Sequence, residues 1–208
     1  MALSNYQIKP IQPADYPAIE YLTREAFWNV YQPGATEHYI VHQFQGRPEL
    51  IADLNLGLWV NDQIIGHIMY VKAQINLDAG QVLPIVTFGP LSIAPKYQHQ
   101  GYGGILLQNS MKRATNLGYA VIAITGNLDF YGRFGFVVGS QLDIHYAAEP
   151  REQVVPYFLI HELIPGTLNG RSGTYEDPVG YTVDSKAVAE FDRQFPPKQK
   201  LRLPGQLQ

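Results

Sequence analysis

The spacing of apolar residues predicts helices and strands along most of the chain, beginning with a strand and two helices. Alternation over residues 6–11 predicts the strand. Apolar residues at helical spacing follow Asp15, which we expect to cap a helix that tolerates Pro17 in its first turn. Thr36 is the expected cap of a second helix, which ends near Gln45.

The middle of the chain predicts consecutive strands. Residues 56–60 and 64–73 are two of them, joined by Asn61-Asp62, which is a hairpin signal. A third strand is expected at 83–93, and it contains Gly89-Pro90. Because proline cannot donate a ladder hydrogen bond and glycine weakens a strand, this pair predicts a bulge or a place where the strand splays from its neighbour.

A helix between two strands is expected next. The helix follows a glycine-rich stretch and ends near Leu117, with Gly118 in the usual position after a helix C-terminus. The elements expected after it are a strand at 119–125, a turn or short helix at 126–134, a strand starting at Phe136 and an apolar strand at 154–163. This order predicts an α+β, or mixed α/β, fold.

The last part of the chain differs in composition. It is rich in glycine, proline and threonine up to Thr182, and Asp184 or Ser185 then caps a short helix that ends before Pro196-Pro197. We expect one main domain at residues 1–164 and an extension at 165–208 that packs on the same domain.

Composition and charge exclude several classes of protein. The net charge of −3 and the isoelectric point near 6.0 argue against a nucleic-acid-binding protein, which needs a basic surface. The absence of cysteine excludes disulfides, a thiolate nucleophile and a cysteine-type zinc site. No apolar run has the length of a secretory leader or the roughly 18 residues of a membrane span, so we expect a cytoplasmic protein.

Candidate chemistry lies between the third strand and the following helix. The strand ends at Ile93, and Gly101, Gly103 and Gly104 lie where the helix begins. Glycines there let backbone N–H groups face outward, and with the helix dipole they form an anion site suited to a pyrophosphate. Lys96 adds a cation at the rim of this site.

Two other nucleotide sites do not fit this segment. A dinucleotide fingerprint requires G-x-G-x-x-G and an acidic residue about 20 positions later, at the end of a strand. The strand at 119–125 carries no acidic residue. A P-loop requires Gly-Lys-Ser or Gly-Lys-Thr, and the sequence contains neither.

Three segments resemble one family of enzymes. Residues 98–103, Gln-His-Gln-Gly-Tyr-Gly, fit the Q/R-x-x-G-x-G/A pyrophosphate loop of the GNAT superfamily of N-acetyltransferases. Residues 89–95 resemble the strand before that loop, and residues 130–136 resemble the later tyrosine signature that ends in Gly-Phe. The resemblance spans residues 6–163, and Gly66-His67-Ile68 is similar to the poorly specified bacterial branch of predicted acetyltransferases.

The resemblance implies a fold and a reaction. The expected fold has a central, mostly antiparallel, twisted sheet that is splayed at the acyl-CoA site and flanked by helices. The expected reaction transfers acetyl from acetyl-CoA, the cosubstrate, to a primary amine by direct attack, with no metal. The implied cofactor-binding residues are Leu91, Ser92 and Ile93 for the pantetheine amides, and Gln98, His99, Gln100, Gly101, Tyr102, Gly103 and Gly104 for the pyrophosphate.

Catalytic roles also follow from the resemblance. One backbone N–H of the strand would stabilise the charge that develops on the thioester oxygen, an effect often worth about 3 kcal/mol. Tyr131 aligns with the residue that protonates or hydrogen-bonds the CoA thiolate; a phenol, with an ordinary pKa near 10, carries its proton at neutral pH. Many members carry an asparagine seven residues before this tyrosine. Here that position is Ile124, and Asn127 is the expected cofactor contact instead.

The residue that removes the proton from the amine has several candidates. Such a base is usually a glutamate, aspartate or histidine that acts through water. His67 is one candidate, although a structural histidine is the alternative. Glu25, Glu37 and Glu162 are others, and a water chain without a dedicated base also fits.

Two further interpretations remain open for the function. The chain could be a non-catalytic acyl-CoA-binding or sensing module, or it could modify a protein N-terminus or lysine. The expected partner is a small-molecule amine or a peptide, with no nucleic acid and no membrane. We expect the extension at 165–208 either to cover part of the acceptor pocket or to mediate self-association as a homodimer.

Overall fold

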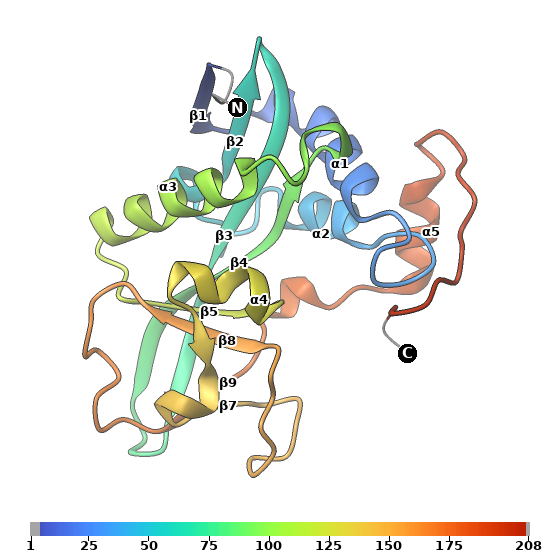
Figure 1. Ribbon diagram of the computed structural model, residues 1–208. Helices are drawn as coiled ribbons and strands as arrows, with labels where there is room; N and C mark the ends of the chain where they lie inside the picture. The colour runs from blue at the N-terminus through green and yellow to red at the C-terminus, as the bar shows by residue number, and fades with distance from the viewer. Residues whose placement is uncertain (1–4, 207–208) are drawn as a thin grey trace. The chain divides into compact units, whose positions relative to one another are not determined.

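The computed structural model describes residues 5–206, which form two compact units (Figure 1). The first unit comprises the described residues up to Met69, Pro90–Leu107 and the residues from Val179 onward. The second comprises Tyr70–Gly89 and Gln108–Pro178. Three elements belong partly to each unit: β3 (Gln63–Leu77), β4 (Val82–Ile93) and α3 (Tyr102–Asn116).

An antiparallel meander forms the strand part of the first unit. It consists of β1 (Tyr6–Pro10), β2 (Leu56–Val60) and the beginning of β3. Asn61 and Asp62 join β2 to β3, and their φ values of 49° and 60° are positive, as a tight hairpin turn of the I′ type needs. These strands and their hairpin confirm the expectation from the sequence.

Three helices complete the first unit: α1 (Tyr16–Phe27), α2 (Glu37–Phe44) and α5 (Ser185–Asp192). All three were expected, and the two expected N-cap residues are in place. Asp15 and Thr36 occupy the N-cap positions without a capping side-chain bond. The Asp15 carboxylate instead accepts from the backbone N–H of Gln12, because a short 3₁₀ turn precedes α1.

A buried ion pair connects α5 to α1. Asp184 caps α5 by accepting from Lys186 and Ala187 N–H, as expected. At the other end of α5, Asp192 accepts from Arg24, whose side chain is 0% exposed, with Nε at 2.6 Å from Oδ1. Burial acts to raise the pKa of Asp192, but the hydrogen bond and charge of Arg24 outweigh it and lower the pKa below its ordinary value.

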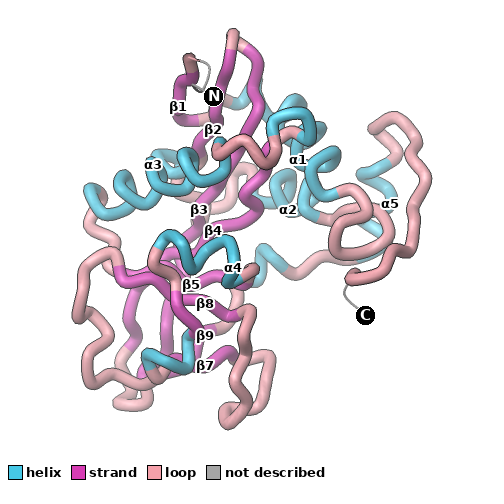
Figure 2. The backbone as a smooth tube through the Cα atoms, in the orientation of Figure 1, coloured by secondary structure: helices cyan, strands magenta, loops and turns pink. Residues whose placement is uncertain are grey.

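After α5 the chain continues to Gln206 without a further helix or strand in the described residues (Figure 2). This tail lies against the end of α1. The Gln199 carbonyl accepts from Trp28 Nε1 at 3.0 Å and from Asn29 Nδ2 at 3.1 Å, and Lys198 Nζ is 2.9 Å from a carboxylate oxygen of Glu25. The tail is therefore bound by specific contacts and is not a free end at these positions.

The second unit contains the other half of the sheet. Its further strands are β5 (Val121–Thr125), β6 (Val137–Val138), β7 (Ile144–Tyr146), β8 (Phe158–Glu162) and β9 (Gly173–Tyr175). β8 pairs antiparallel with both β5 and β6, while β9 pairs with β3 and with β7. The short helix α4 (Leu128–Tyr131) follows β5. The mixed sheet with helices confirms the expected α+β class.

The sequence did not predict β7 and β9. Each has three residues, too few for alternation to be recognised, and β9 lies in the extension, where the sequence predicts one short helix. The division into a domain at 1–164 and an extension at 165–208 stays a prediction.

The pairing between β4 and β5 ends early. Among the described residues of the second unit, the parallel register joins them at Val86 and Ile122 and at no later position. β5 nevertheless pairs with β8 as far as Thr125. The Gly89-Pro90 pair lies after this position within β4, and the splay that it predicts stays a prediction.

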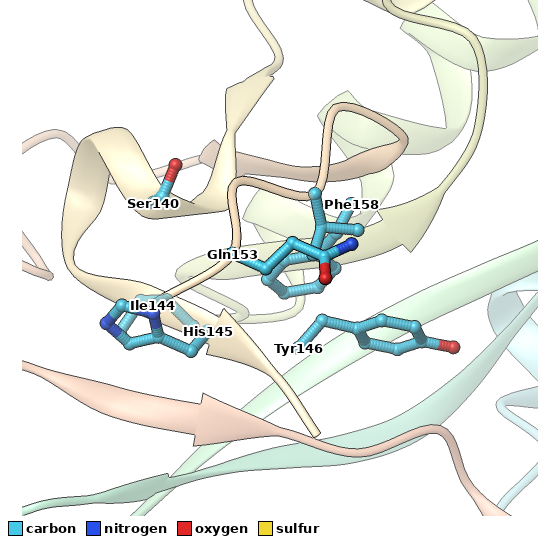
Figure 3. A pocket seen from close by; sticks show the side chains of 7 residues that line it. Ser140, Ile144, His145, Tyr146, Gln153 and Phe158 are labelled. Atoms are coloured by element: carbon cyan, nitrogen blue, oxygen red, sulfur yellow. The ribbon is translucent and has the colours of Figure 1, made fainter. Parts of the chain in front are cut away.

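A small cavity lies in the second unit (Figure 3). Its volume of about 10 Å³ is near the minimum needed for one water molecule. Residues that line it include Ser140, Ile144, His145, Tyr146, Gln153 and Phe158. It is too small to hold a nucleotide. Within residues 5–206, no helix combines the length and the apolar character required to cross a bilayer.

Replacing Asp192 with alanine tests the link between α5 and α1. Asp192→Ala leaves the Arg24 guanidinium buried with one carboxylate partner fewer, so we expect the free energy of unfolding to fall by about 3 kcal/mol. Glu190→Ala is the matched control on the same helix, because the Glu190–Arg193 pair is exposed to solvent. Denaturant titration measures both, and equal effects of the two variants would contradict the assignment.

Candidate active site

The end of β4 directs alternate backbone groups to opposite edges. Ala94 N–H donates to the Ile65 carbonyl of β3 at 2.8 Å. Because successive residues of an extended chain point their N–H and C=O groups in opposite directions, those of Leu91 and Ile93 point to the edge away from β3. The Ile93 carbonyl accepts from Gln98 Nε2 at 2.9 Å, which agrees with this direction.

Ser92 faces the helices and not this edge. Its side chain is 1% exposed, and its Oγ donates to Oγ1 of Thr23 on α1 at 3.0 Å. On the β3 side, a Cβ added to Gly66 would lie 2.7 Å from Ile93 Cδ1 and 3.3 Å from the Ser92 carbonyl oxygen, so only glycine permits this approach. A contact of Ser92 with the cofactor therefore depends on its backbone.

The loop after β4 is braced by its own glutamines. A 3₁₀ turn (Pro95–Tyr97) follows the strand, and α3 then begins at Tyr102. Gln98 Nε2 donates to the Ile93 carbonyl, and Gln100 Nε2 donates to the Lys96 carbonyl at 2.8 Å. These two motif side chains hold the loop in shape, which leaves the backbone N–H groups as the part suited to an anion.

Two residues of the loop adopt positive φ. His99 has φ 59° and Gly101 has φ 91°, and no atom lies within 4 Å of a Cβ added to Gly101. The ring of Tyr102 is buried and contacts Tyr97, with ring centroids 6.0 Å apart. Tyr102 therefore offers its N–H, with those of Gly103 and Gly104, at the first turn of α3.

The second unit holds Tyr131 at the end of α4. Its ring packs between Phe88, Phe130 and Phe136, with centroid distances of 5.8, 4.9 and 5.6 Å. A Cβ added to Gly126 would lie 2.5 Å from Tyr131 Cε2, so the absence of a side chain there makes room for the ring. Packing on several sides fixes the direction of the phenol.

Asn127 is the N-cap of α4. Its Oδ1 accepts from Asp129 N–H at 2.7 Å, and the residue is exposed. The side-chain oxygen is thus engaged in starting the helix that carries Tyr131. A contact of Asn127 with the cofactor stays a prediction.

His67 lies in the interior of the first unit. Its side chain is 0% exposed, and Nε2 is 2.7 Å from Asn55 Oδ1. Since Asn55 Nδ2 donates to the Tyr16 hydroxyl, Asn55 Oδ1 is the acceptor, and the proton of His67 is assigned to Nε2. Burial lowers the pKa of His67 to about 3. These contacts favour the structural alternative, and a role as base stays a prediction.

Two of the candidate glutamates already have partners. Glu25 lies 2.9 Å from Lys198 Nζ and 3.5 Å from Arg24 Nη1. Glu162 accepts from Leu168 N–H at 2.7 Å and more weakly from Gly166. Both carboxylates are therefore already engaged by groups of the protein itself.

Glu37 has a different environment at the start of α2. Burial raises its pKa above the ordinary value, against the opposing effect of hydrogen bonds from its own N–H and that of Thr36. Thr36 N–H donates to Oε2 at 2.9 Å. Of the three candidate glutamates, Glu37 is the one whose pKa moves toward the range of a general base.

The histidines of α2 contact separate carboxylates. His38 Nε2 is 3.2 Å from an Asp192 oxygen, and His42 Nδ1 is 2.9 Å from a Glu20 oxygen. Over the part of the chain that the structure describes, no group of three or more His, Asp or Glu side chains is placed to hold a metal ion.

Comparison with known proteins identifies the family. The model of the acetyltransferase (GNAT) domain matches residues 7–139, which is more than half of the 208 residues. The chain belongs to the GNAT acetyltransferase family. The resemblance to the GNAT family is thereby confirmed, and this GNAT protein is an acyltransferase.

A curated relative supports the assignment over a longer stretch. The uncharacterized N-acetyltransferase YhbS of Escherichia coli K12 is 28% identical over 167 residues, which cover 79% of the GNAT chain described here and 91% of YhbS. The similarity therefore extends beyond the pyrophosphate loop.

Solved structures confirm the fold. The crystal structure of Escherichia coli YhbS in complex with CoA has a TM-score of 0.73 at 24% identity, covering 87% of this GNAT chain and 94% of that one. A GNAT acetyltransferase from Brucella melitensis in complex with acetyl-CoA has a TM-score of 0.68 at 22% identity, covering 86% and 100%.

Sequence analysis missed some residues that shape the GNAT site. It did not find that Thr23 is the partner of Ser92, or that Gly66 and Gly126 make room for neighbouring side chains. One signal was present, since Thr23 lies next to Leu22 in the apolar pattern of α1 and is 0% exposed. A polar residue within an apolar stripe requires a buried partner.

Acid titration of stability tests the buried state of His67. The unfolded chain binds a proton near pH 6.5, whereas the folded protein binds it only near the lowered pKa of about 3. Stability is therefore lost as the pH falls from about 6.5 toward 3, by about 1.4 kcal/mol per pH unit for this histidine. His67→Gln removes that contribution, so its stability should depend less steeply on pH than that of the wild type.

His38 provides the comparison for this titration. Burial lowers the pKa of His38 to about 4, while the charge of Asp192 acts in the opposite direction. The contribution of His38 to the loss of stability therefore ends near pH 4, and that of His67 continues at lower pH. Denaturant titrations at a series of pH values measure the slopes. An unchanged slope in His67→Gln would mean that His67 is protonated in the folded protein.

Proposed function

We propose that this protein is an N-acetyltransferase that transfers acetyl from acetyl-CoA to a primary amine. The observation that supports it most directly is the outer edge of β4, where Leu91 and Ile93 direct backbone groups away from β3, followed at once by the glycine turn into α3. The complexes of the two similar proteins with CoA and acetyl-CoA support the choice of donor.

The backbone of β4 binds the pantetheine arm in this proposal. An extended amide chain can pair with Leu91 and Ile93 as an added strand pairs with a sheet edge. Ser92 contributes through its backbone alone, since its hydroxyl is bonded to Thr23. An N–H of this segment then stabilises the negative charge that develops on the thioester oxygen.

The loop from Gln98 to Gly104 binds the diphosphate of the donor. The N–H groups at the start of α3 carry the positive end of the helix dipole, which favours an anion. Gln98 and Gln100 act on the loop itself, and the open side of Gly101 lets a phosphate approach the backbone. His99 contributes its backbone, in its left-handed conformation.

Tyr131 holds a proton at Oη for the leaving group. The amine nitrogen forms a bond with the acetyl carbon, the carbon–sulfur bond breaks, and the CoA thiolate accepts the phenol proton or a hydrogen bond from it. Acetyl-CoA supplies the activated acetyl group, so no nucleophile of the protein is needed. The aromatic packing of Tyr131 keeps the hydroxyl in one direction.

The proton of the amine leaves through Glu37 or through water. Glu37 is preferred to Glu25 and Glu162 because no ion pair joins it to another of the residues 5–206 and because burial raises its pKa. His67 remains an alternative whose burial counts against direct contact with a substrate. Asn127 is retained as a further cofactor contact of the proposal.

A non-catalytic acyl-CoA-binding or sensing module is the second candidate. One observation favours it: the predicted base His67 is buried and neutral, and Glu25 and Glu162 have partners. For the enzyme we propose a small-molecule amine or a peptide as acceptor, cytoplasmic localisation, and a tail that covers the acceptor pocket or mediates a homodimer.

A thiol-release assay with acetyl-CoA and a panel of amines separates the two functions. For the enzyme we expect turnover, and for Tyr131→Phe a fall in kcat of about 100-fold because the proton donor is lost. The CoA dissociation constant of this variant should stay within about threefold of the wild type, because the loop is unchanged. Tyr157→Phe is the control, since that tyrosine is exposed and bonded to Glu149.

Thermal melting with CoA completes the experiment. CoA at 100 times its dissociation constant should stabilise the folded protein by about 2.7 kcal/mol. Stabilisation without turnover of any amine indicates the sensing module. The absence of any stabilisation by CoA contradicts both functions.

A further inference from the structure

We propose that Thr23 is a positioning residue that fixes the donor-binding segment of β4 through the side chain of Ser92. The inference rests on the proposed function, because it assigns to a residue of α1 the task of holding the strand that binds pantetheine. Thr23 acts through Ser92 and touches no substrate itself.

The contact is buried and directional. Ser92 Oγ donates to Thr23 Oγ1 at 3.0 Å, and the two side chains are 1% and 0% exposed. Both residues belong to the first unit. Solvent cannot replace either partner at such a site, so loss of one hydroxyl leaves the other without its bond.

Ser92 lies between the two residues that present their backbone to the outer edge. Its own backbone faces β3, like that of Ala94, while its side chain points to α1. A displacement of Ser92 must therefore move the N–H and C=O groups of Leu91 and Ile93 with it. Holding Ser92 in place therefore also holds the edge that binds pantetheine in the proposed function.

Hydrogen bonds from other directions also hold this segment. Pro90 itself has no N–H to donate. Gln98 donates to the Ile93 carbonyl, and Ala94 N–H donates to the Ile65 carbonyl. The Thr23 hydroxyl adds the restraint from the helix side, where apolar packing alone would allow sliding.

The variant Thr23→Val tests this role, since valine keeps the shape and the helix propensity of threonine and removes the hydroxyl. We use two probes: CoA, and adenosine 3′,5′-bisphosphate, which has the nucleotide phosphates but no pantetheine. The affinity for CoA should fall about tenfold, while that for adenosine 3′,5′-bisphosphate should stay within twofold of the wild type. kcat/KM for acetyl-CoA should fall by the same factor as CoA affinity.

Two further variants make the test independent of folding defects. Thr23→Ser should restore the affinity for CoA, because it restores the hydroxyl. Ser92→Ala should weaken CoA binding, and its combination with Thr23→Val should cost less than the two single effects together, since no buried hydroxyl is then left without a partner. Tyr175 lies in β9 and donates to Asp177, so Tyr175→Phe breaks a hydrogen bond in the second unit and is the control for stability loss alone.

The outcomes separate the two levels of the proposal. A lower melting temperature of Thr23→Val with an unchanged ratio of the two affinities, as expected for Tyr175→Phe, overturns the positioning role and leaves the proposed function intact. Additive effects of Thr23→Val and Ser92→Ala also overturn it. Failure of the wild type to bind CoA overturns the proposed function and this inference together.

Discussion

The structure depends on a strand that must keep one edge open and yet stay fixed. The register of β4 with β5 joins Val86 to Ile122, and the final residues of β4 direct the backbone groups of Leu91 and Ile93 away from β3. An unpaired sheet edge normally has freedom to move or to bind another chain. Here the segment is restrained by hydrogen bonds from Ala94 to β3, from the following loop to Ile93 and from Ser92 to α1. These bonds hold the segment on the sides other than its outer edge.

The parts that the sequence predicts are those encoded by local signals. The Gly89-Pro90 pair predicts the end of pairing because proline has no donor, and the glycine turn predicts the start of α3 because only glycine tolerates φ 91° at Gly101 without strain. The tyrosine signature around Tyr131 is likewise a short run of residues. Such signals act within a few positions, so one sequence suffices to recognise them.

The parts that the sequence does not predict join residues that are far apart. Ser92 and Thr23 are 69 positions apart, and Arg24 and Asp192 are 168 apart, so no periodicity links them. His67 shows the same limit in another form. Its place beside Gly66 in a family-like motif suggests chemistry, but its burial follows from the register of β3 and from Asn55, which a motif does not contain. The type of a side chain indicates which chemistry is possible, and its burial decides whether a substrate can reach it.

Contacts within the protein also decide which groups of the loop from Gln98 to Gly104 can bind the donor in the proposed function. The side chains of Gln98 and Gln100 donate to backbone carbonyls, and the buried ring of Tyr102 contacts Tyr97. The motif therefore contributes N–H groups whose directions its side chains have fixed in advance. Because donors held in advance need no rearrangement when an anion binds, they lose less free energy on binding than mobile side chains would. In the proposed direct attack, acetyl-CoA supplies the activated acetyl group, so the contribution of the protein depends on how firmly such backbone groups and the phenol of Tyr131 are held.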